Sequence, residues 1–404
     1  MMHEASLPPD PARPSAAFCA QPELAQAAAI VVRSLQAHEH ERWDAFVEAC
    51  PEATFFHRAG WQTIVQQGFK HDCHFLYAQQ DGRIVGVLPL AHMRSRLFGS
   101  SLVSLPFCVY GGIAGANPAA RLALDAAAQA LARRLGVGHL EYRWRELQDD
   151  VQGNAQDKTQ DKTQDKVQDD AQDGAQKNTR ESAAAGWLHK PLYATFRRPL
   201  QPDAEQNLLL IPRKQRAVVR KAMAAGLHST VEDDLAHFYP IYAASLHRLG
   251  TPVFARRHFS LLRTVFGSAC EILTVYHGRQ AQASVLLFYF RDEVLPYYGG
   301  GTPLARSTGA NDFMYWEAMR RACARGYRLF DFGRSKLGTG AFDFKKNWGF
   351  TAQALPYAYR LVRAKALPEV NPLNPKYALF IRLWRRLPLP LANLLGPHIV
   401  RQLG

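Results

Sequence analysis

The stretch Asn311–Phe350 reads NDFMYWEAMRRACARGYRLFDFGRSKLGTGAFDFKKNWGF, and it decides the fold prediction. Its first part predicts a helix, because arginines gather in the last turn and Gly326 follows as a stop. A short apolar run then predicts a strand that ends at Asp331. The segment after this strand holds four glycines and four basic side chains together with aromatic residues. This order predicts a helix, a strand and a basic loop that could approach a ligand closely.

The glycine-rich segment does not match the known nucleotide-binding loops. Gly333 and Gly338 have the G-x-x-x-x-G separation, but Thr339 and Gly340 stand where a P-loop requires Lys and then Ser or Thr. A dinucleotide fingerprint fails as well, since Asp343 occupies the place of its third glycine. We therefore do not expect nucleotide hydrolysis or dinucleotide binding at this segment.

The chain contains a weak internal repeat. Each copy predicts a hairpin that turns at Gly82 or Gly278, and then a strand that ends in Tyr-Gly-Gly at Tyr110 or Tyr298. A helix closed by Gly136 or Gly326 and a further strand, HLEYRWRE in the first copy and RLFDFGRSK in the second, complete each copy. The repeat therefore predicts two modules that share one α/β topology.

The predicted organisation has four parts, with an insertion in the second. They are a disordered leader at 1–28, a first module at 29–200 with a polar insertion at 156–178, a second module at 201–365, and an amphipathic basic tail at 366–404. The stretch 211–227 predicts a helix with Pro212 in its first turn and Gly226 as its stop.

Composition and charge narrow the function classes. The chain has 404 residues and a net charge of +14, and the second half carries the excess, with 28 Lys and Arg against 13 Asp and Glu from residue 201 onward. A basic half favours an anionic partner such as a phosphate-bearing substrate, RNA or a lipid surface. The six cysteines form no C-x-x-C pair and H-E-x-x-H is absent, so we predict no metal site. The N-terminus lacks a signal-peptide pattern, and we expect a cytoplasmic protein.

The block Asn311–Phe350 resembles the C-terminal module of FemAB-like proteins, which are similar to the GNAT acyltransferase fold and to the BioF2-like group. IPRKQRA, PYYGGGTP and LWRRLPLPLANLLGP add a closer resemblance to FemAB-related proteins associated with PEP-CTERM/exosortase systems. The resemblance implies an α/β fold with mixed sheets in two tandem GNAT-like modules. It implies transfer of an aminoacyl or acyl group to an amine of a cell-envelope, exopolysaccharide or peptidoglycan-type precursor. The donor, aminoacyl-tRNA or acyl-CoA, stays open, and we expect no tightly bound cofactor.

The resemblance also assigns site residues. Lys345 matches the lysine of the family's FK block, which implies a role at the reacting centre; we interpret it as the oxyanion stabiliser. Asp331 would take a proton or orient Lys345 or Arg334, with a structural ion pair as the alternative, and Tyr298 would donate a proton. The residues expected to bind substrate are Arg334, Lys336, Lys346, Trp348, Asn311, Arg213 and Arg216. A solvated basic loop is the alternative interpretation of the cations around the glycines.

Two other classes of function remain open from the sequence. The basic helix from Arg213 to Lys221 could bind tRNA through its phosphates. The chain could also be a catalytically inactive binding protein that keeps the fold.

The tail predicts a further helix. From Lys376 to Leu387, Tyr377, Phe380, Ile381, Trp384 and Leu387 recur at helical spacing. This pattern is typical of an interfacial helix, and we expect peripheral contact with an anionic membrane through 376–395, at its inner face. The competing interpretation is a tail that packs on the protein's own domain, where the same stripe is part of the core. A lipid-linked or otherwise phosphate-bearing acceptor would fit either arrangement.

Overall fold

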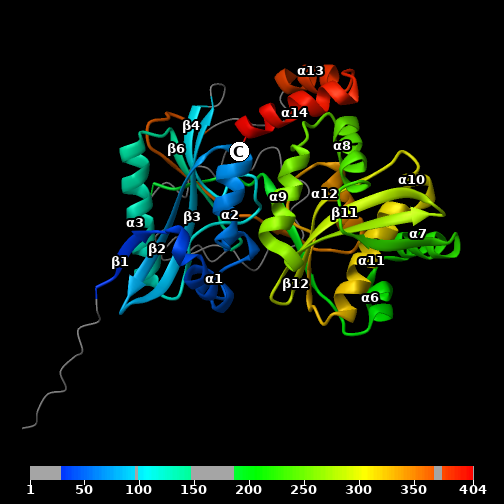
Figure 1. Ribbon diagram of the computed structural model, residues 1–404, viewed down its shortest axis with the longest axis horizontal. Helices are drawn as coiled ribbons and strands as arrows, with labels where there is room; N and C mark the ends of the chain where they lie inside the picture. Colours follow the sequence, from blue (N-terminus) through cyan, green and yellow to red (C-terminus); the bar gives the residue numbers. More distant parts are fainter. Residues whose placement is uncertain (1–28, 96–98, 147–185, 368–374, 404) are drawn as a thin grey trace, which may run out of the picture.

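The computed structural model describes residues 29–95, 99–146, 186–367 and 375–403. The predicted leader and the polar insertion at 156–178 lie outside the described residues. Two mixed β-sheets stand side by side, each with helices on both faces, and the two C-terminal helices lie across one side of the pair (Figure 1).

The first sheet has the strand order β1-β2-β3-β4-β6-β16-β7, with β5 paired to β3. The strands are β1 (Val31–Ser34), β2 (Asp72–Gln80), β3 (Arg83–Ser95), β4 (Gly99–Ser104), β5 (Ala114–Gly115), β6 (His139–Arg143), β7 (Leu188–His189) and β16 (Tyr357–Leu361). The helices are α1 (His40–Ala49), α2 (Gly60–Thr63) with the π-helical turn Ile64–Phe69, and α3 (Pro118–Leu135). Leu88 and Leu90 of β3 pack toward α3, whereas Val87 and Ala91 face the second module, as strand alternation requires.

The second sheet has the order β14-β8-β13-β12-β11-β10-β9, with β15 paired to β8. The strands are β8 (Tyr193–Pro199), β9 (Leu227–Glu232), β10 (Cys270–His277), β11 (Gln280–Phe290), β12 (Glu293–Gly301), β13 (Leu329–Asp331), β14 (Ser335–Lys336) and β15 (Ala352–Ala354). The helices are α6 (Ala204–Leu210), α7 (Arg213–Ala224), α8 (Phe238–Leu249), α9 (Arg256–Phe266), α10 (Ala305–Thr308), α11 (Ala310–Ala324) and α12 (Gly340–Asn347). Helices α7 and α11 cover the outer face, and α8 and α9 cover the face toward the first module.

Most of the local elements of the predicted repeat are confirmed. The hairpins β2–β3 and β10–β11 turn at Gly82 and Gly278, and both glycines have a positive φ, which favours glycine. Helix α3 ends at Gly136 in the left-handed conformation, and Gly326 follows α11. Tyr298 lies in strand β12 as predicted, whereas Tyr110 lies in a loop, so the prediction of a strand ending at Tyr110 was wrong.

Each module contributes one strand to the sheet of the other. The predicted boundary at residue 200 did not allow for this exchange. Strand β8 precedes that boundary, yet it pairs with β13, β14 and β15 of the second sheet. Strand β16 comes from the second half, yet it pairs with β6 and β7 of the first sheet. The boundary therefore does not separate the two sheets. The chain passes from the first sheet to the second between β7 and β8, and returns to the first sheet between β15 and β16.

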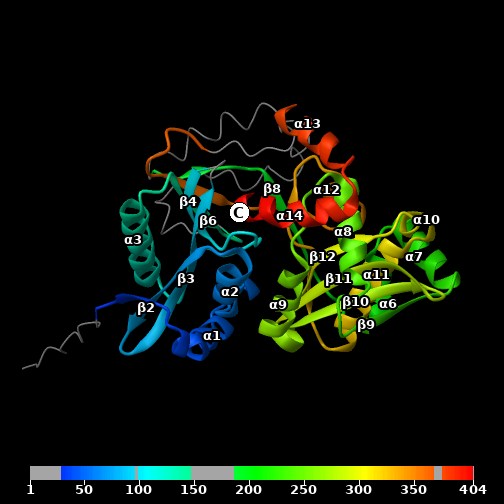
Figure 2. The ribbon, with the colours of Figure 1, turned by 45° about the horizontal axis from the view of Figure 1, so that its top comes forward.

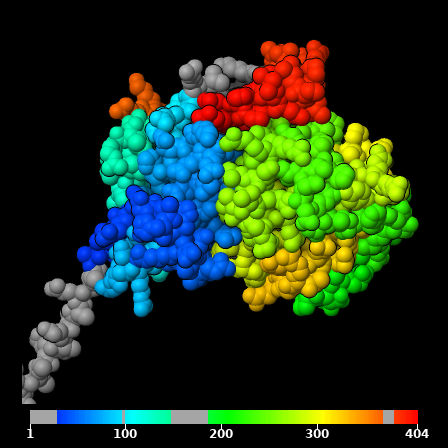
Figure 3. All heavy atoms as spheres, in the orientation of Figure 1, coloured from blue at the N-terminus to red at the C-terminus, as the bar shows by residue number. Residues whose placement is uncertain are grey.

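One hydrophobic core extends across the seam between the modules. Phe55 of the first module stacks on Phe288 of β11 with ring centroids 4.4 Å apart, and Phe56 meets Tyr297 at 5.1 Å. All four side chains belong to the same cluster, with Tyr297 at its edge. Aromatic pairs of this kind stabilise the fold beyond the contribution of the apolar area that they bury. The modules therefore form a single packed unit (Figure 3).

The tail forms two helices, α13 (Pro375–Trp384) and α14 (Leu389–Leu403). Helix α14 is continuous, with Pro397 inside it. Trp384 is buried, and Ile381 packs beside Gly250 at the end of α8. The stripe expected to face a membrane is therefore partly buried against the protein, because Trp384 and Ile381 fill the space beside α8.

Candidate active site

A pocket opens where strands β12 and β13 part. These parallel strands pair only at Glu293–Leu329 and Val294–Phe330, and β12 then carries a bulge at Tyr297 that bends it away. The resulting cavity of 480 Å³, here called the central pocket, receives side chains from both modules and from α14. Its lining includes Phe107, Val109, Tyr242, Phe254, Tyr297, Tyr298, Gly299, Tyr315, Phe332, Gly333, Arg334, Ser335, Ala341, Lys345, Val400 and Leu403.

Lys345 of α12 projects its ammonium group into this pocket. The Nζ donates hydrogen bonds to the carbonyl oxygens of Gly333 at 2.9 Å and Arg334 at 3.1 Å. The rings of Phe196 and Phe332 lie 5.6 and 5.8 Å from it. Burial lowers the pKa of the Lys345 ammonium to about 7, against the opposing effect of Asp331. The group can therefore be cationic or neutral near neutral pH.

Two polar neighbours lie beside Lys345 in the same pocket. Arg334 donates to the Tyr357 hydroxyl at 3.1 Å, and its guanidinium lies 4.6 Å from the centre of the Tyr193 ring. These contacts hold the guanidinium at the pocket wall. The Ser335 hydroxyl is buried and makes no hydrogen bond within the described residues, which leaves it available to a ligand.

Tyr298 lies on the opposite wall, on β12. Its hydroxyl is 3.4 Å from Nε2 of His258, and burial raises the pKa of Tyr298 well above its ordinary value. Burial lowers the pKa of His258 to about 3, so this imidazole is neutral. Tyr298 therefore stays a protonated phenol, which can donate a hydrogen bond but is a poor source of a proton.

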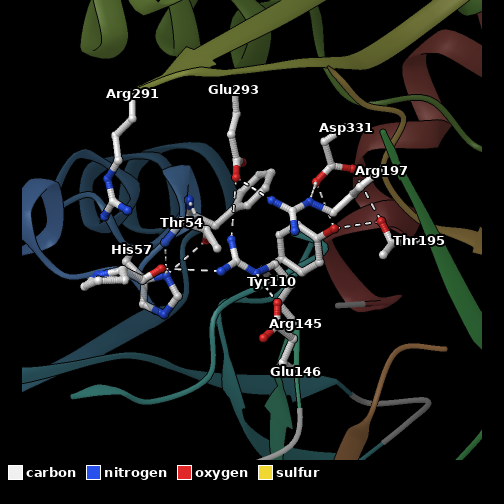
Figure 4. Close-up of polar contacts among 12 residues, drawn as sticks. Thr54, His57, Tyr110, Arg145, Glu146, Thr195, Arg197, Arg291, Glu293 and Asp331 are labelled. Atoms are coloured by element: carbon white, nitrogen blue, oxygen red, sulfur yellow. Dashed lines mark hydrogen bonds and ion pairs between the residues drawn. The ribbon is translucent and has the colours of Figure 1, made fainter. Parts of the chain in front are cut away.

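Asp331 is fully buried and does not line the central pocket. Its carboxylate accepts from the Gly333 backbone N–H at 2.7 Å and from the Tyr110 hydroxyl at 2.9 Å, and it pairs with Arg197 at 3.3 Å. Arg197 also binds Glu293, as Figure 4 shows. The structure thus places Asp331 in an ion-pair network between the modules, where it supports the loop that carries Arg334.

The other predicted substrate-binding residues lie outside the central pocket. Trp348 is buried in the second module and donates from Nε1 to Asp312 at 2.9 Å, so its role is packing. The remaining residues, Lys336, Lys346, Asn311, Arg213 and Arg216, are not among the pocket's lining. Helix α7 places Arg213 and Arg216 on the outer face, where Arg216 donates to the Leu209 carbonyl.

Several pocket residues had no signal in the sequence. Phe107 comes from a loop of the first module, and Val400 and Leu403 come from α14. Only the packing of distant segments brings them to Lys345, whereas Ser335 adjoins the motif and could have been named from it.

The first module has a smaller pocket, of 250 Å³, at the corresponding place. Tyr110 and Arg145 line it, at the repeat positions of Tyr298 and Arg334. Trp144 stands at the position of Gly333 and lies against Gly112, where a Cβ would come within 1.8 Å of its ring. The lining includes no lysine, so of these two pockets the central pocket is the one that combines an arginine with a lysine amine. The described residues contain no cluster of His, Cys, Asp or Glu that could hold a metal ion.

Comparison with known proteins supports the fold. Residues 213–346 match the family model described as an acetyltransferase (GNAT) domain. Among solved structures, a crystal structure of FemX matches with 15% identity and a TM-score of 0.61, over 87% of this chain and 100% of that chain. The C-terminal domain of a putative lysylphosphatidylglycerol synthetase from Agrobacterium fabrum matches with 12% identity and a TM-score of 0.50, over 80% of this chain and 92% of that chain.

No curated protein matches the sequence. In the described part of the chain, every helix is too short or too polar to cross a membrane. With two mixed sheets and helices on both faces of each, the chain is a tandem GNAT-like α/β protein whose second module matches the acetyltransferase (GNAT) domain.

Proposed function

We propose that the chain transfers an acyl or aminoacyl group from an activated ester or thioester to an amine, with the reaction in the central pocket. The observation that carries this proposal is Lys345, a half-buried amine with a pKa lowered to about 7 at the place where β12 and β13 part. Perturbed amines in a cleft are favoured candidates for chemistry. The GNAT domain match over the same module supports the reaction class.

Acyl transfer requires a hydrogen-bond donor near the carbonyl oxygen of the acyl group. The acceptor nitrogen attacks the donor carbonyl carbon, a C–N bond forms, and the oxygen becomes an oxyanion before the thiolate or the ribose oxygen leaves with its electron pair. A protonated Lys345 has three N–H groups, and the Gly333 and Arg334 carbonyls accept two of them. The third can stabilise the oxyanion, a contribution of about 3–4 kcal/mol for one donor. The proton lost by the acceptor nitrogen passes to solvent.

The polar groups around Lys345 suggest how the substrates are held. Arg334 offers a fixed guanidinium for a phosphate or carboxylate of the donor or acceptor. Ser335 and Tyr298 offer hydroxyl groups from two sides. Acyl-CoA and aminoacyl-tRNA both bring phosphates, so either donor fits this arrangement.

For the acceptor we propose an amine on a cell-envelope or exopolysaccharide precursor, including lipid-linked ones. The resemblance to proteins of PEP-CTERM/exosortase systems supports this class. A structural neighbour bears the name of a lysylphosphatidylglycerol synthetase, which adds support for a lipid-bearing acceptor.

Native mass spectrometry with acyl-CoA, aminoacyl-tRNA and nucleotide-sugar candidates tests the proposal. We expect one donor class to be retained by the wild-type protein and lost in Ala341→Trp, which fills the pocket from an exposed position on its rim. The matched control is Ala224→Trp on the exposed side of α7. Equal retention by both variants would place the ligand elsewhere, and retention of a ligand without any transfer would favour a catalytically inactive binding protein.

A further inference from the structure

Exposed apolar side chains gather on the two C-terminal helices. Of the large hydrophobic residues that are exposed in the described chain, half lie on α13 and α14. They are Leu379, Phe380, Leu383, Leu391, Leu394, Leu395 and Leu403, with exposed fractions from 37 to 65%. Trp384, Ala392, Gly396 and Val400 of the same helices are buried. Phe380 stacks on Trp384, and Leu403 lies on the side of Val400, so the outer face consists of Leu379, Leu383, Leu391, Leu394 and Leu395. The apolar outer face is therefore additional to the face that packs on the protein.

The segment from the start of α13 to the end of α14 carries only positive formal charge. Between residues 375 and 403 there are five Lys and Arg and no Asp or Glu. Arg382, Arg385 and Arg386 are exposed, and Arg382 and Arg386 lie at helical spacing from Leu379 and Leu383. Leucine interleaved with arginine on one helical face is the pattern that inserts shallowly into an anionic lipid surface.

The fold fixes this face relative to the central pocket. Gly396 of α14 lies against Val253, and His71 of the first module is 2.9 Å from the Arg401 carbonyl oxygen. Helix α14 thus spans both modules, as Figures 1 and 2 show. Val400 and Leu403 on its inner side line the central pocket. One helix therefore forms a wall of the pocket with one side and presents leucines with the other.

We propose that the leucine and arginine face of α13 and α14 docks on the surface of an anionic lipid bilayer. The arginines bind lipid phosphates, and the leucines enter the boundary between headgroups and acyl chains. Docking through α14 brings the central pocket next to the membrane surface. The docking does not depend on the acyl transfer proposed above. Delivery of a lipid-linked acceptor to the central pocket, in contrast, rests on that proposed function.

Vesicle flotation of the full chain tests this surface. We expect the protein to float with vesicles of phosphatidylcholine and phosphatidylglycerol, and at least tenfold less with phosphatidylcholine alone. The variant Leu383→Asp/Leu394→Asp should reduce flotation at least tenfold. Its control is Leu209→Asp/Leu210→Asp, which places the same charges on exposed leucines of α6.

A second pair of variants tests the charges. Arg382→Gln/Arg386→Gln should lower vesicle partition about fivefold for each arginine, whereas Arg133→Gln/Arg134→Gln on α3 should leave it unchanged. Lys345→Met should float like the wild-type protein, so a failed transfer reaction and a failed docking surface give different results.

The proposal is wrong if the wild-type protein does not float, or if the leucine variant floats as well as its α6 control. It is also wrong if the wild-type protein is a dimer that the leucine variant splits while neither binds vesicles. That result would assign the face to a second copy of the chain.

Discussion

Replacing Lys345 by methionine should change how the stability of the protein depends on pH. The unfolded chain binds a proton at Lys345 up to about pH 10.5, whereas burial lowers the pKa in the folded protein to about 7. Between these values the unfolded state holds one proton more than the folded state, so the free energy of unfolding rises with pH. The penalty for burying the ammonium is fully present below pH 7 and disappears above pH 10.5.

The size of this effect follows from the two pKa values. The slope is ~1.4 kcal/mol per pH unit, and the gain between pH 7 and pH 9 comes to ~2 kcal/mol. Solvent around the partly accessible Lys345 reduces the expected gain to about 1 kcal/mol. Lys345→Met keeps the length of the side chain and removes the titrating group, so its unfolding free energy should lack this gain.

Urea unfolding followed by tryptophan fluorescence at pH 7 and pH 9 measures the difference. Lys346→Met, on the exposed neighbouring position, is the control and should keep the wild-type pH dependence. The reasoning fails if the wild-type protein and Lys345→Met differ in unfolding free energy by the same amount at both pH values, because Lys345 would then have an ordinary pKa.

Two further substitutions test the structural roles given to buried polar contacts. Trp348→Phe removes the indole donor to Asp312 and should lower the free energy of unfolding by about 1–3 kcal/mol without changing KM, since Trp348 does not line the central pocket; a raised KM with unchanged stability would restore its predicted role in substrate binding. Tyr110→Phe removes the hydroxyl that donates to the Asp331 carboxylate and should lower stability by about 1.5–3 kcal/mol in urea unfolding, and an unchanged midpoint would contradict a role for this contact in joining the modules.

Local signals in the sequence predicted the elements of each module well. The turns at Gly82 and Gly278 and the glycine ends of α3 and α11 depend on a few neighbouring residues, so they are visible in the chain. The exchange of β8 and β16 depends on pairing between distant segments. Pro199 pairs with Leu329, and nothing near Pro199 signals that partner.

Part of the lining of the central pocket was predicted for the same reason. Lys345, Arg334 and Tyr298 belong to recognisable motifs, and the structure brings all three to the central pocket. Trp348 belongs to the same motif, but helix α12 turns it inward beside Phe344, because residues four apart share a helical face. A run of alternating aromatics could not reveal which of them would face the pocket.

The tail shows a different limit of sequence reasoning. Apolar residues occur on both sides of α13, with Ile381 and Trp384 on one side and Leu379 and Leu383 on the other. Helical spacing identifies both stripes but not which one the protein covers. Only the position of Gly250 beside Ile381 decides this.

The central claim is that acyl transfer takes place at Lys345 in the central pocket. A single-turnover transfer assay, with the donor that native mass spectrometry identifies and an amine acceptor, tests it most directly. We predict that Lys345→Met lowers the rate constant about 10²–10³-fold while donor binding persists, as expected for the loss of one oxyanion donor, and that Lys346→Met stays at the wild-type rate. A Lys345→Met protein that is folded, binds the donor and transfers at the wild-type rate would contradict the account.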